Sequence, residues 1–94
     1  MQPEPTSREE TERELLLRLK KIEGQVRGIA RMIQEGRSCG EIILQLSAVK
    51  AAVSQVAVST LACYLTEAVT EGATQGKDLK ASVAEFIELF RKLT

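Results

Sequence analysis

Three stretches of the chain place apolar residues at helical spacing. In the first, expected at about 7–35, apolar side chains recur every three or four residues: Leu15, Leu19, Ile22, Val26, Ile29 and Ile33. This spacing, sustained over nearly three heptads, is typical of a helix that packs along another long helix. Thr6 and Glu9 fit a capping box at its start, and Gly36 fits the residue just past its end.

The second stretch, expected at about 39–71, is apolar around much of its circumference. Ser38 and Glu41 give its start the pattern of a capping box. Its apolar residues are not confined to one stripe; they include Ile42, Ile43, Leu44, Leu46, Val49, Val53, Val56, Val58, Leu61 and Leu65. A helix that is apolar on several sides is buried on several sides. In a chain of 94 residues, only other subunits can supply that cover.

A glycine-containing break at 72–76 precedes a third helix, expected at about 77–92, whose apolar face holds Leu79, Val83, Phe86, Ile87 and Phe90. No strand-like alternation is long enough to matter. The pattern therefore predicts an all-α fold: a three-helix protomer that forms an antiparallel four-helix-bundle dimer, assembling as a dimer of dimers. We assign residues 1–6 to a flexible N-terminal tail and residues 7–94 to a single helical domain.

Charge is segregated along a chain whose formal net charge is zero. Residues 1–12 carry a net charge of −3, residues 13–37 carry +4 and residues 38–94 carry −1. The first helix is therefore basic and can bind an anion such as DNA phosphate, although many solvated helices are equally basic. Gly24 and Gly28 share one face of this helix, where a second backbone or a phosphate can approach closely; close helix packing is the favoured interpretation.

The composition excludes several classes of function. Histidine is absent, which removes the usual general base and the commonest zinc ligand. No paired-carboxylate, phosphate-loop or dinucleotide motif is present, so we expect no enzyme activity. No stretch reaches roughly 18 uninterrupted apolar residues, and no signal peptide opens the chain. We therefore expect a cytoplasmic protein with reduced thiols and no membrane contact.

The two cysteines differ in what their positions suggest. If Ser38 caps the second helix, Cys39 lies at its first position, where unpaired N–H groups and the helix dipole stabilise a thiolate. Arg37 beside it adds positive charge; the alternative is an unreactive small residue in a turn. Cys63 lies deep in the same helix, where a cysteine is commonly a small core residue. Core or interface packing is also the favoured role of its neighbour Tyr64. Cys63 lies 24 residues after Cys39, a separation of about 36 Å along a helix, so a site shared by both cysteines would have to lie between subunits.

At the level of sequence motifs, residues 18–29 (RLKKIEGQVRGI) closely resemble the first-helix signature of the CsoR/RcnR-type repressors. Residues 32–33, the turn at Cys39 and residues 43–52 (ILQLSAVKAA) extend the resemblance, which covers about 14–70. It implies a disc-shaped tetramer that represses operons and releases operator DNA when an inducer binds. Depending on the branch, the inducer is copper(I), nickel or cobalt, formaldehyde, or persulfide. The DNA contacts that it implies are Arg18, Lys20, Lys21, Gln25, Arg27, Arg31 and Lys50.

The inducer site departs from the pattern of this family. Metal-sensing branches combine the cysteine at the start of the second helix with a histidine 25 residues later and a cysteine or histidine 29 residues later; here those positions hold Tyr64 and Ala68. The persulfide branch keeps a cysteine at the position of Ala68. The formaldehyde branch uses an N-terminal proline, whereas Pro3 here is the third residue. Only Cys39 matches an expected ligand.

Three functions remain open on the sequence. The first is a repressor of the CsoR/RcnR type that leaves DNA when Cys39, with or without Cys63, reacts with a persulfide or another thiol-reactive species. The second is a copper(I)-responsive repressor that uses Cys39 and Cys63, because copper(I) accepts two thiolates. Against it, Cys63 lies about 100° around the helix from the family's histidine position. The third is a structural helical oligomer with no DNA target.

Overall fold

The computed structural model describes the backbone of residues 7–75 and 78–93, and the side chains of 8–70 and 78–93. All regular structure in these ranges is helical: α1 (Ser7–Gln34), α2 (Cys39–Gln75) and α3 (Leu79–Leu93). The prediction of an all-α, three-helix chain is thereby confirmed. The chain divides into two compact units within α2, the first ending at Val56 and the second beginning at Ala57. The predicted tail lies outside the described residues, and the assignment of 7–94 to one domain stays a prediction.

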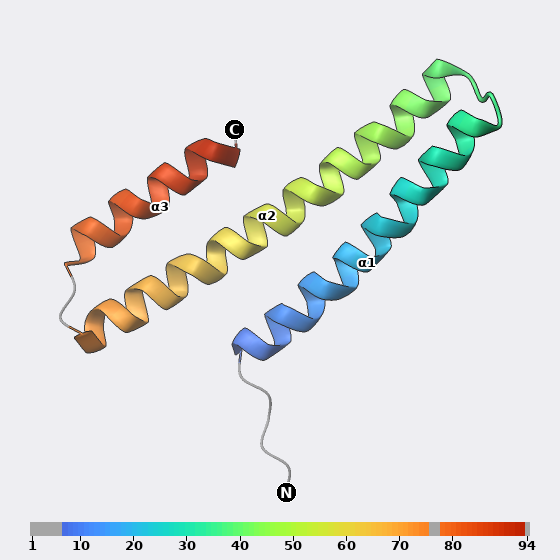
Figure 1. The fold of residues 1–94 in the computed structure, drawn as a ribbon. Helices are drawn as coiled ribbons and strands as arrows, with labels where there is room; N and C mark the ends of the chain where they lie inside the picture. The colour runs from blue at the N-terminus through green and yellow to red at the C-terminus, as the bar shows by residue number, and fades with distance from the viewer. Residues whose placement is uncertain (1–6, 76–77, 94) are drawn as a thin grey trace, which may run out of the picture. The chain divides into compact units, whose positions relative to one another are not determined.

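In the first unit, α1 and the first part of α2 lie antiparallel, joined by a tight turn (Figure 1). Ile22 and Ile29 of α1, seven residues apart, are buried. The half-buried positions of α2 in this unit include Ile42, Val49 and Val56, which are again spaced by seven. Seven residues are nearly two helical turns, so each set lies along one face of its helix, and these faces pack together.

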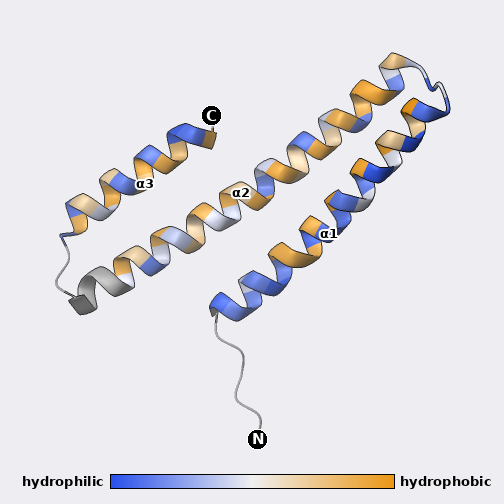
Figure 2. Ribbon diagram, viewed as in Figure 1, coloured by the Kyte–Doolittle hydropathy of each residue, from blue (hydrophilic) through white to orange (hydrophobic). Residues whose placement is uncertain are grey.

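The other half of the predicted α1 seam faces away from α2. Leu19, Val26 and Ile33 are 46%, 51% and 60% exposed. They also lie seven residues apart, on a face adjacent to that of Ile22 and Ile29. On α2, exposed apolar side chains include Ile43, Leu46 and Val53. Hydrophobic positions recur along both helices (Figure 2). The first unit therefore uses half of its apolar seam internally and leaves half uncovered.

The turn between α1 and α2 is closed by Gly36. Its φ is +73°, in the left-handed region. The Arg37 N–H donates to the Met32 carbonyl at 3.0 Å, and the Gly36 N–H donates to the Ile33 carbonyl at 3.1 Å. This pair of bonds is a Schellman motif, which satisfies carbonyls left unpaired at a helix end. The glycine predicted just past the first helix is thus confirmed in that role.

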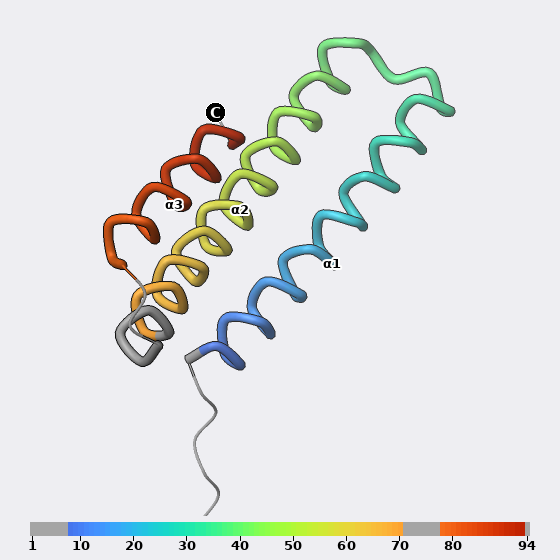
Figure 3. Tube along the Cα trace, turned by 60° about the vertical axis from the view of Figure 1, so that its left-hand side comes forward, coloured from blue at the N-terminus to red at the C-terminus, as the bar shows by residue number. Residues whose placement is uncertain are grey.

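In the second unit, α3 lies antiparallel beside the later part of α2, as two views agree (Figures 1 and 3). Leu61 of α2 and Ser82 of α3 are its buried residues, and Ser82 is only 1% exposed. A side chain as small as serine lets the two helices approach closely at that point. The Tyr64 hydroxyl donates to Glu85 Oε2 at 2.8 Å and so ties α2 to α3.

The end of α2 differs from the prediction. The helix continues to Gln75, whereas we expected it to end near residue 71, at a break over 72–76. The reason is that glycine keeps its backbone donor and acceptor, so Gly72 lowers helix propensity by roughly 1 kcal/mol relative to alanine without removing a hydrogen bond. Glycine content alone therefore overstated the break.

The start of α3 also differs from the prediction. The helix begins at Leu79 rather than at residue 77, which lies outside the described residues. Asp78 Oδ1 accepts a hydrogen bond from the Lys80 N–H at 3.1 Å. An aspartate that accepts a bond from the second helical residue is an N-cap, so the capping side chain, and not the first polar residue after the glycine, sets the boundary.

The stretch Cys39–Thr70 of α2 is long and apolar enough to cross a membrane, judged by length and composition alone. Only 6% of its most apolar window is buried within the described residues. Our expectation of no span rested on uninterrupted apolar runs, and Lys50 with several Ser, Thr and Gln residues interrupts this one. A helix covered by other protein chains passes the same test, so the exposed apolar surface requires a cover without specifying a membrane.

We predict opposite outcomes for alanine at Gly36 and at Gly40. A Cβ at either position would meet no atom within 4 Å, but only Gly36 has a positive φ. Gly36→Ala should therefore lower the free energy of unfolding by about 1–2 kcal/mol, the cost of an L-residue in the left-handed region. Gly40→Ala should be neutral or stabilising. Urea denaturation at matched protein concentration checks both variants; equal losses would show that space, not backbone conformation, selects glycine at Gly36.

Candidate functional site

A polar groove of about 220 Å³ lies between α1 and α2 in the first unit. Its walls carry two cationic and two amide side chains around a small apolar area, and its lining residues are Arg18, Lys21, Ile22, Gln25, Ala52 and Gln55. Three of the seven residues predicted to contact DNA therefore meet at one concave feature. Positive charge and amide hydrogen-bond donors around a cavity are suited to an anion.

The groove and the uncovered apolar seam lie on opposite sides of the first unit. At 100° per residue, Arg18, Lys21 and Gln25 are displaced from Ile22 in one rotational direction around α1. Leu19 and Val26 are displaced in the other direction. The two helices are antiparallel and packed face to face, so the groove opens on one side of the pair and the apolar seam lies on the other.

The remaining predicted DNA contacts do not line the groove. Lys20, Arg27, Arg31 and Lys50 are all exposed, and the first three lie on the part of α1 turned away from α2. The Arg27 guanidinium forms an ion pair and a hydrogen bond with the Glu23 carboxylate, and both side chains are largely exposed. An exposed pair of this kind contributes only about 0–1 kcal/mol. The residues predicted to contact DNA are thus divided among the groove, the outer face of α1 and an exposed position on α2.

Two observations concern the polar side of α1 directly. Gln25 Oε1 is buried and accepts no hydrogen bond from the described residues. A Cβ added to Gly24 or Gly28 would meet nothing within 4 Å. Close packing between helices of one chain, the interpretation that we favoured for these glycines, is therefore not observed. They leave the surface of α1 low where another molecule can approach.

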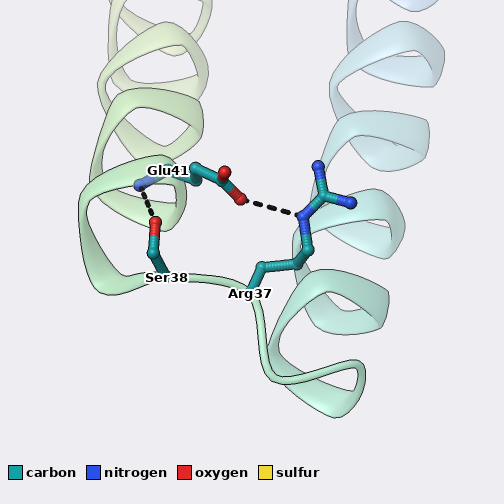
Figure 4. A network of polar contacts seen from close by, with 3 residues as sticks. All are labelled: Arg37, Ser38 and Glu41. Carbon is teal, nitrogen blue, oxygen red and sulfur yellow. Dashed lines mark hydrogen bonds and ion pairs between the residues drawn. The ribbon is translucent and has the colours of Figure 1, made fainter.

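Cys39 is the first residue of α2 and is exposed. The cap predicted for this helix is present, because Ser38 Oγ accepts a hydrogen bond from the Glu41 N–H at 3.2 Å (Figure 4). The Glu41 carboxylate accepts a second bond from Arg37 Nε at 2.8 Å. A capping box would instead turn that carboxylate toward the backbone N–H of Ser38.

Arg37 therefore serves a different role from the one that we predicted. We expected its charge to act beside Cys39, but its guanidinium is paired with Glu41. The hydrogen bond from Arg37 to Glu41, with the attraction between their charges, raises the pKa of Arg37 above its ordinary value. The negative carboxylate offsets the cation locally, which leaves the helix start itself as the favourable feature around Cys39.

Cys63 belongs to the second unit and is half-buried. Its thiol donates a long hydrogen bond to Glu67 Oε1, with 4.0 Å between sulfur and oxygen. The hydroxyl of the next residue, Tyr64, donates a hydrogen bond to Glu85. Ala68, the last of the positions compared with metal-sensing repressors, carries no donor atom.

A metal site is not assembled by the described residues of one chain. They contain no group of three or more His, Cys, Asp or Glu side chains that could hold an ion. Cys39 and Cys63 belong to different units, and the Tyr64 hydroxyl is engaged by Glu85. The ligand pattern of the metal-sensing branches thus does not fit this chain taken alone.

Three residues in these surroundings were not identified from the sequence: Gln55 completes the groove, Glu67 accepts from Cys63, and Glu85 accepts from Tyr64. Glu41, which was named as a capping residue, also pairs with Arg37. Glu67 could have been found, because it lies four residues after Cys63 on the same helix. Gln55 is uncharged and Glu85 is 21 residues from its partner, so neither gives a local signal.

The described residues form three helices and no strand, with a basic groove and a cysteine at the start of the second helix, which are the features of a small helical transcriptional repressor. Residues 11–92 match the family described as "Metal-sensitive transcriptional repressor". The chain belongs to this family. Membership confirms the resemblance to CsoR/RcnR-type repressors and the expectation that the protein is a regulator and not an enzyme.

Two similar proteins are copper sensors by name. The chain is 40% identical over 77 residues to the copper-sensing transcriptional repressor CsoR of Bacillus subtilis (strain 168), covering 82% of this chain and 75% of that protein. It is 46% identical over 59 residues to the copper-sensing transcriptional repressor RicR of Mycobacterium tuberculosis (strain ATCC 25618 / H37Rv), covering 63% and 62% respectively.

Two solved structures share the fold. The nickel-responsive transcriptional regulator InrS superposes with a TM-score of 0.75 at 30% identity, covering 100% of this chain and 99% of that one. The copper-sensing repressor CsoR with Cu(I) from Geobacillus thermodenitrificans NG80-2 gives a TM-score of 0.77 at 33% identity, covering 96% and 92%. The fold is therefore that of metal-responsive repressors, although the described residues do not form their kind of metal site.

We predict that Tyr64 titrates above pH 10. The hydrogen bond to Glu85, with desolvation and the nearby negative charge, raises the pKa of Tyr64 above its ordinary value of 10.0. Because the bond needs the protonated phenol, its contribution to stability is present below pH 10 and is lost as pH rises through the raised pKa. Tyr64 is the only tyrosine and there is no tryptophan, so tyrosinate absorbance reports this group alone.

The matched variants are Glu85→Gln and Glu88→Gln, both on α3. Glu85→Gln should move the midpoint of the absorbance titration back toward 10. Glu88→Gln should leave this midpoint unchanged, because Glu88 accepts its hydrogen bond from Arg91, at 3.2 Å. A wild-type midpoint at or below 10 would contradict the Tyr64–Glu85 bond.

Proposed function

We propose that this protein is a cytoplasmic DNA-binding repressor that binds operator DNA as an oligomer and releases it when Cys39 reacts with a thiol-reactive inducer such as a persulfide. The observation that carries the proposal is the chemistry left at the family's inducer positions. Cys39 is exposed at a helix start, whereas Tyr64 is hydrogen-bonded elsewhere and Ala68 has no donor. A thiol that stands without the other ligands favours covalent chemistry over coordination.

The DNA-binding side is proposed to be the polar side of α1 and α2. It comprises Arg18, Lys20, Lys21, Gln25, Arg27, Arg31 and Lys50. Family membership supports a DNA target, and the concentration of positive charge on one helix supplies the attraction to phosphates. A structural oligomer without a DNA target leaves this charge, and the low surface at Gly24 and Gly28, without a purpose.

The oligomer is proposed because the apolar seam has no cover within the first unit. Leu19, Val26 and Ile33 form a continuous exposed stripe, and α2 adds more apolar surface beside it. Contiguous exposed apolar surface of this kind marks an interface. A second copy offers the same stripe, so two copies can pair isologously as a four-helix bundle, and two such dimers can form the tetramer typical of the family.

A charge in the exposed stripe should break the assembly. Val26→Glu places a carboxylate where the second copy packs, so we expect the oligomer to dissociate at micromolar concentration, whereas Gln34→Glu, the same charge at an exposed position on α1, should leave it intact. Sedimentation velocity of both variants gives the answer. Unchanged assembly of Val26→Glu would place the interface elsewhere.

The proposed chemistry at Cys39 is sulfur transfer. The Cys39 thiolate attacks the outer sulfur of an organic persulfide, and the sulfur–sulfur bond of that persulfide breaks. The organic thiolate leaves with the electron pair, and Cys39 becomes a persulfide without any further oxidant. The Ser38 cap places Cys39 at the start of α2, where its thiol is exposed to a reagent in solvent.

A copper(I) response is the second candidate, favoured by the similarity to copper-sensing repressors. Cys39 and Cys63 are the only thiols of the chain, and copper(I) accepts two such soft donors. They lie in different units, so this candidate requires Cys39 of one copy and Cys63 of another. The hydrogen bond from the Cys63 thiol to the Glu67 carboxylate would be lost in such a site.

Separate cysteine variants distinguish the two candidates. Cys39→Ala should retain binding to the DNA upstream of its own gene but lose release by an organic persulfide, because the attacking atom is absent. Cys63→Ala should keep the persulfide response. If copper(I) is the inducer, both variants should lose release by copper(I). The measurement is fluorescence anisotropy of labelled DNA, with persulfide and copper(I) added in separate titrations. Full release of Cys39→Ala by either agent would refute Cys39 sensing of that agent.

A further inference from the structure

Building on the DNA-binding function proposed above, we infer that the α1–α2 groove is a pocket that seats one phosphate of the DNA backbone, and that Gln55 of α2 completes it. The outer basic face of α1 is then secondary. The groove draws together side chains from both helices, which an unbroken basic face on one helix does not do.

Charge is the first reason. Arg18 and Lys21 both line the groove and lie one helical turn apart on the same side of α1. Two cations at one concavity focus their field on a single anion, and the partly apolar walls from Ile22 and Ala52 lower the local dielectric.

The amides are the second reason. Gln25 and Gln55 approach the groove from opposite helices, and each carries two N–H donors. Gln25 Oε1 is buried without a partner among the described residues, so the present orientation of this amide is unfavourable. The N–H donors of both amides are the groups that can bind an anion in the groove. Phosphate oxygens accept such bonds, and amide side chains are common phosphate contacts in protein–DNA complexes.

Size is the third reason. The groove has a volume of about 220 Å³, several times the roughly 30 Å³ that one water occupies in the liquid. It can therefore hold a phosphate group rather than a single solvent molecule. Gly28 lies seven residues after Lys21, on the same side of α1, and leaves open space above the helix, which lets the sugar–phosphate chain lie close to it.

A carboxylate placed in the groove tests this assignment. Gln55→Glu adds one negative charge in the pocket, and Gln34→Glu adds the same charge at an exposed position of α1 outside it. We expect Gln55→Glu to weaken DNA binding at least about tenfold and to reduce the slope of log affinity against log salt by about one. Gln34→Glu should bind like wild type. Sedimentation and helical circular dichroism of both variants verify that assembly and fold are kept.

The outcomes separate this inference from the function on which it rests. Failure of the wild type to bind its own upstream DNA would overturn the repressor function and the phosphate pocket with it. Wild-type binding that Gln55→Glu leaves unchanged, or that Gln34→Glu weakens equally, would overturn the pocket alone. In the last experiment, phosphorus NMR measures the binding of inorganic phosphate. If Gln55→Glu abolishes phosphate binding but leaves DNA affinity and salt slope unchanged, the groove takes a small anion and not DNA.

Discussion

The division of one apolar seam between two partners is the constraint on which this molecule depends. Ile22 and Ile29 bury one half of the α1 seam against α2, while Leu19 and Val26 hold the other half in the open. The internal half fixes α1 against α2 and thereby forms the groove on the opposite side. The exposed half is apolar surface that is unfavourable in water, and in the proposed function a second copy covers it. The groove and the proposed assembly surface lie on opposite sides of the same helix pair.

In the proposed function, this arrangement gives a physical route from Cys39 to the bound DNA. Cys39 begins α2, and the same helix supplies Ala52 and Gln55 to the groove. A modification that displaces the start of α2 can change the spacing of the groove walls, because a helix moves largely as a rigid element. The Schellman turn at Gly36 joins the two helices through few residues, so a shift at one helix end is carried to the other.

Local rules predicted much of the fold, because helix spacing and caps are local. The seam, the left-handed Gly36 and the Ser38 cap were all readable from neighbouring residues. The end of α2 was not, since glycine content alone does not say whether a helix stops. The DNA-binding residues stay a prediction; what sequence could not indicate is that Arg18, Lys21 and Gln25 share a groove with Gln55, whose place depends on how two helices pack. The role of Arg37 was misjudged because Glu41 competes for it.

The proposed inducer chemistry and DNA contacts both depend on the proposed assembly, in which a second copy covers the exposed apolar seam of α1. Sedimentation equilibrium of the wild-type protein at micromolar concentration tests this claim most directly. We predict masses that are multiples of 10.3 kDa, with a tetramer or at least a dimer and no detectable monomer. A stable, helical species of 10.3 kDa that binds DNA without assembling would contradict the account.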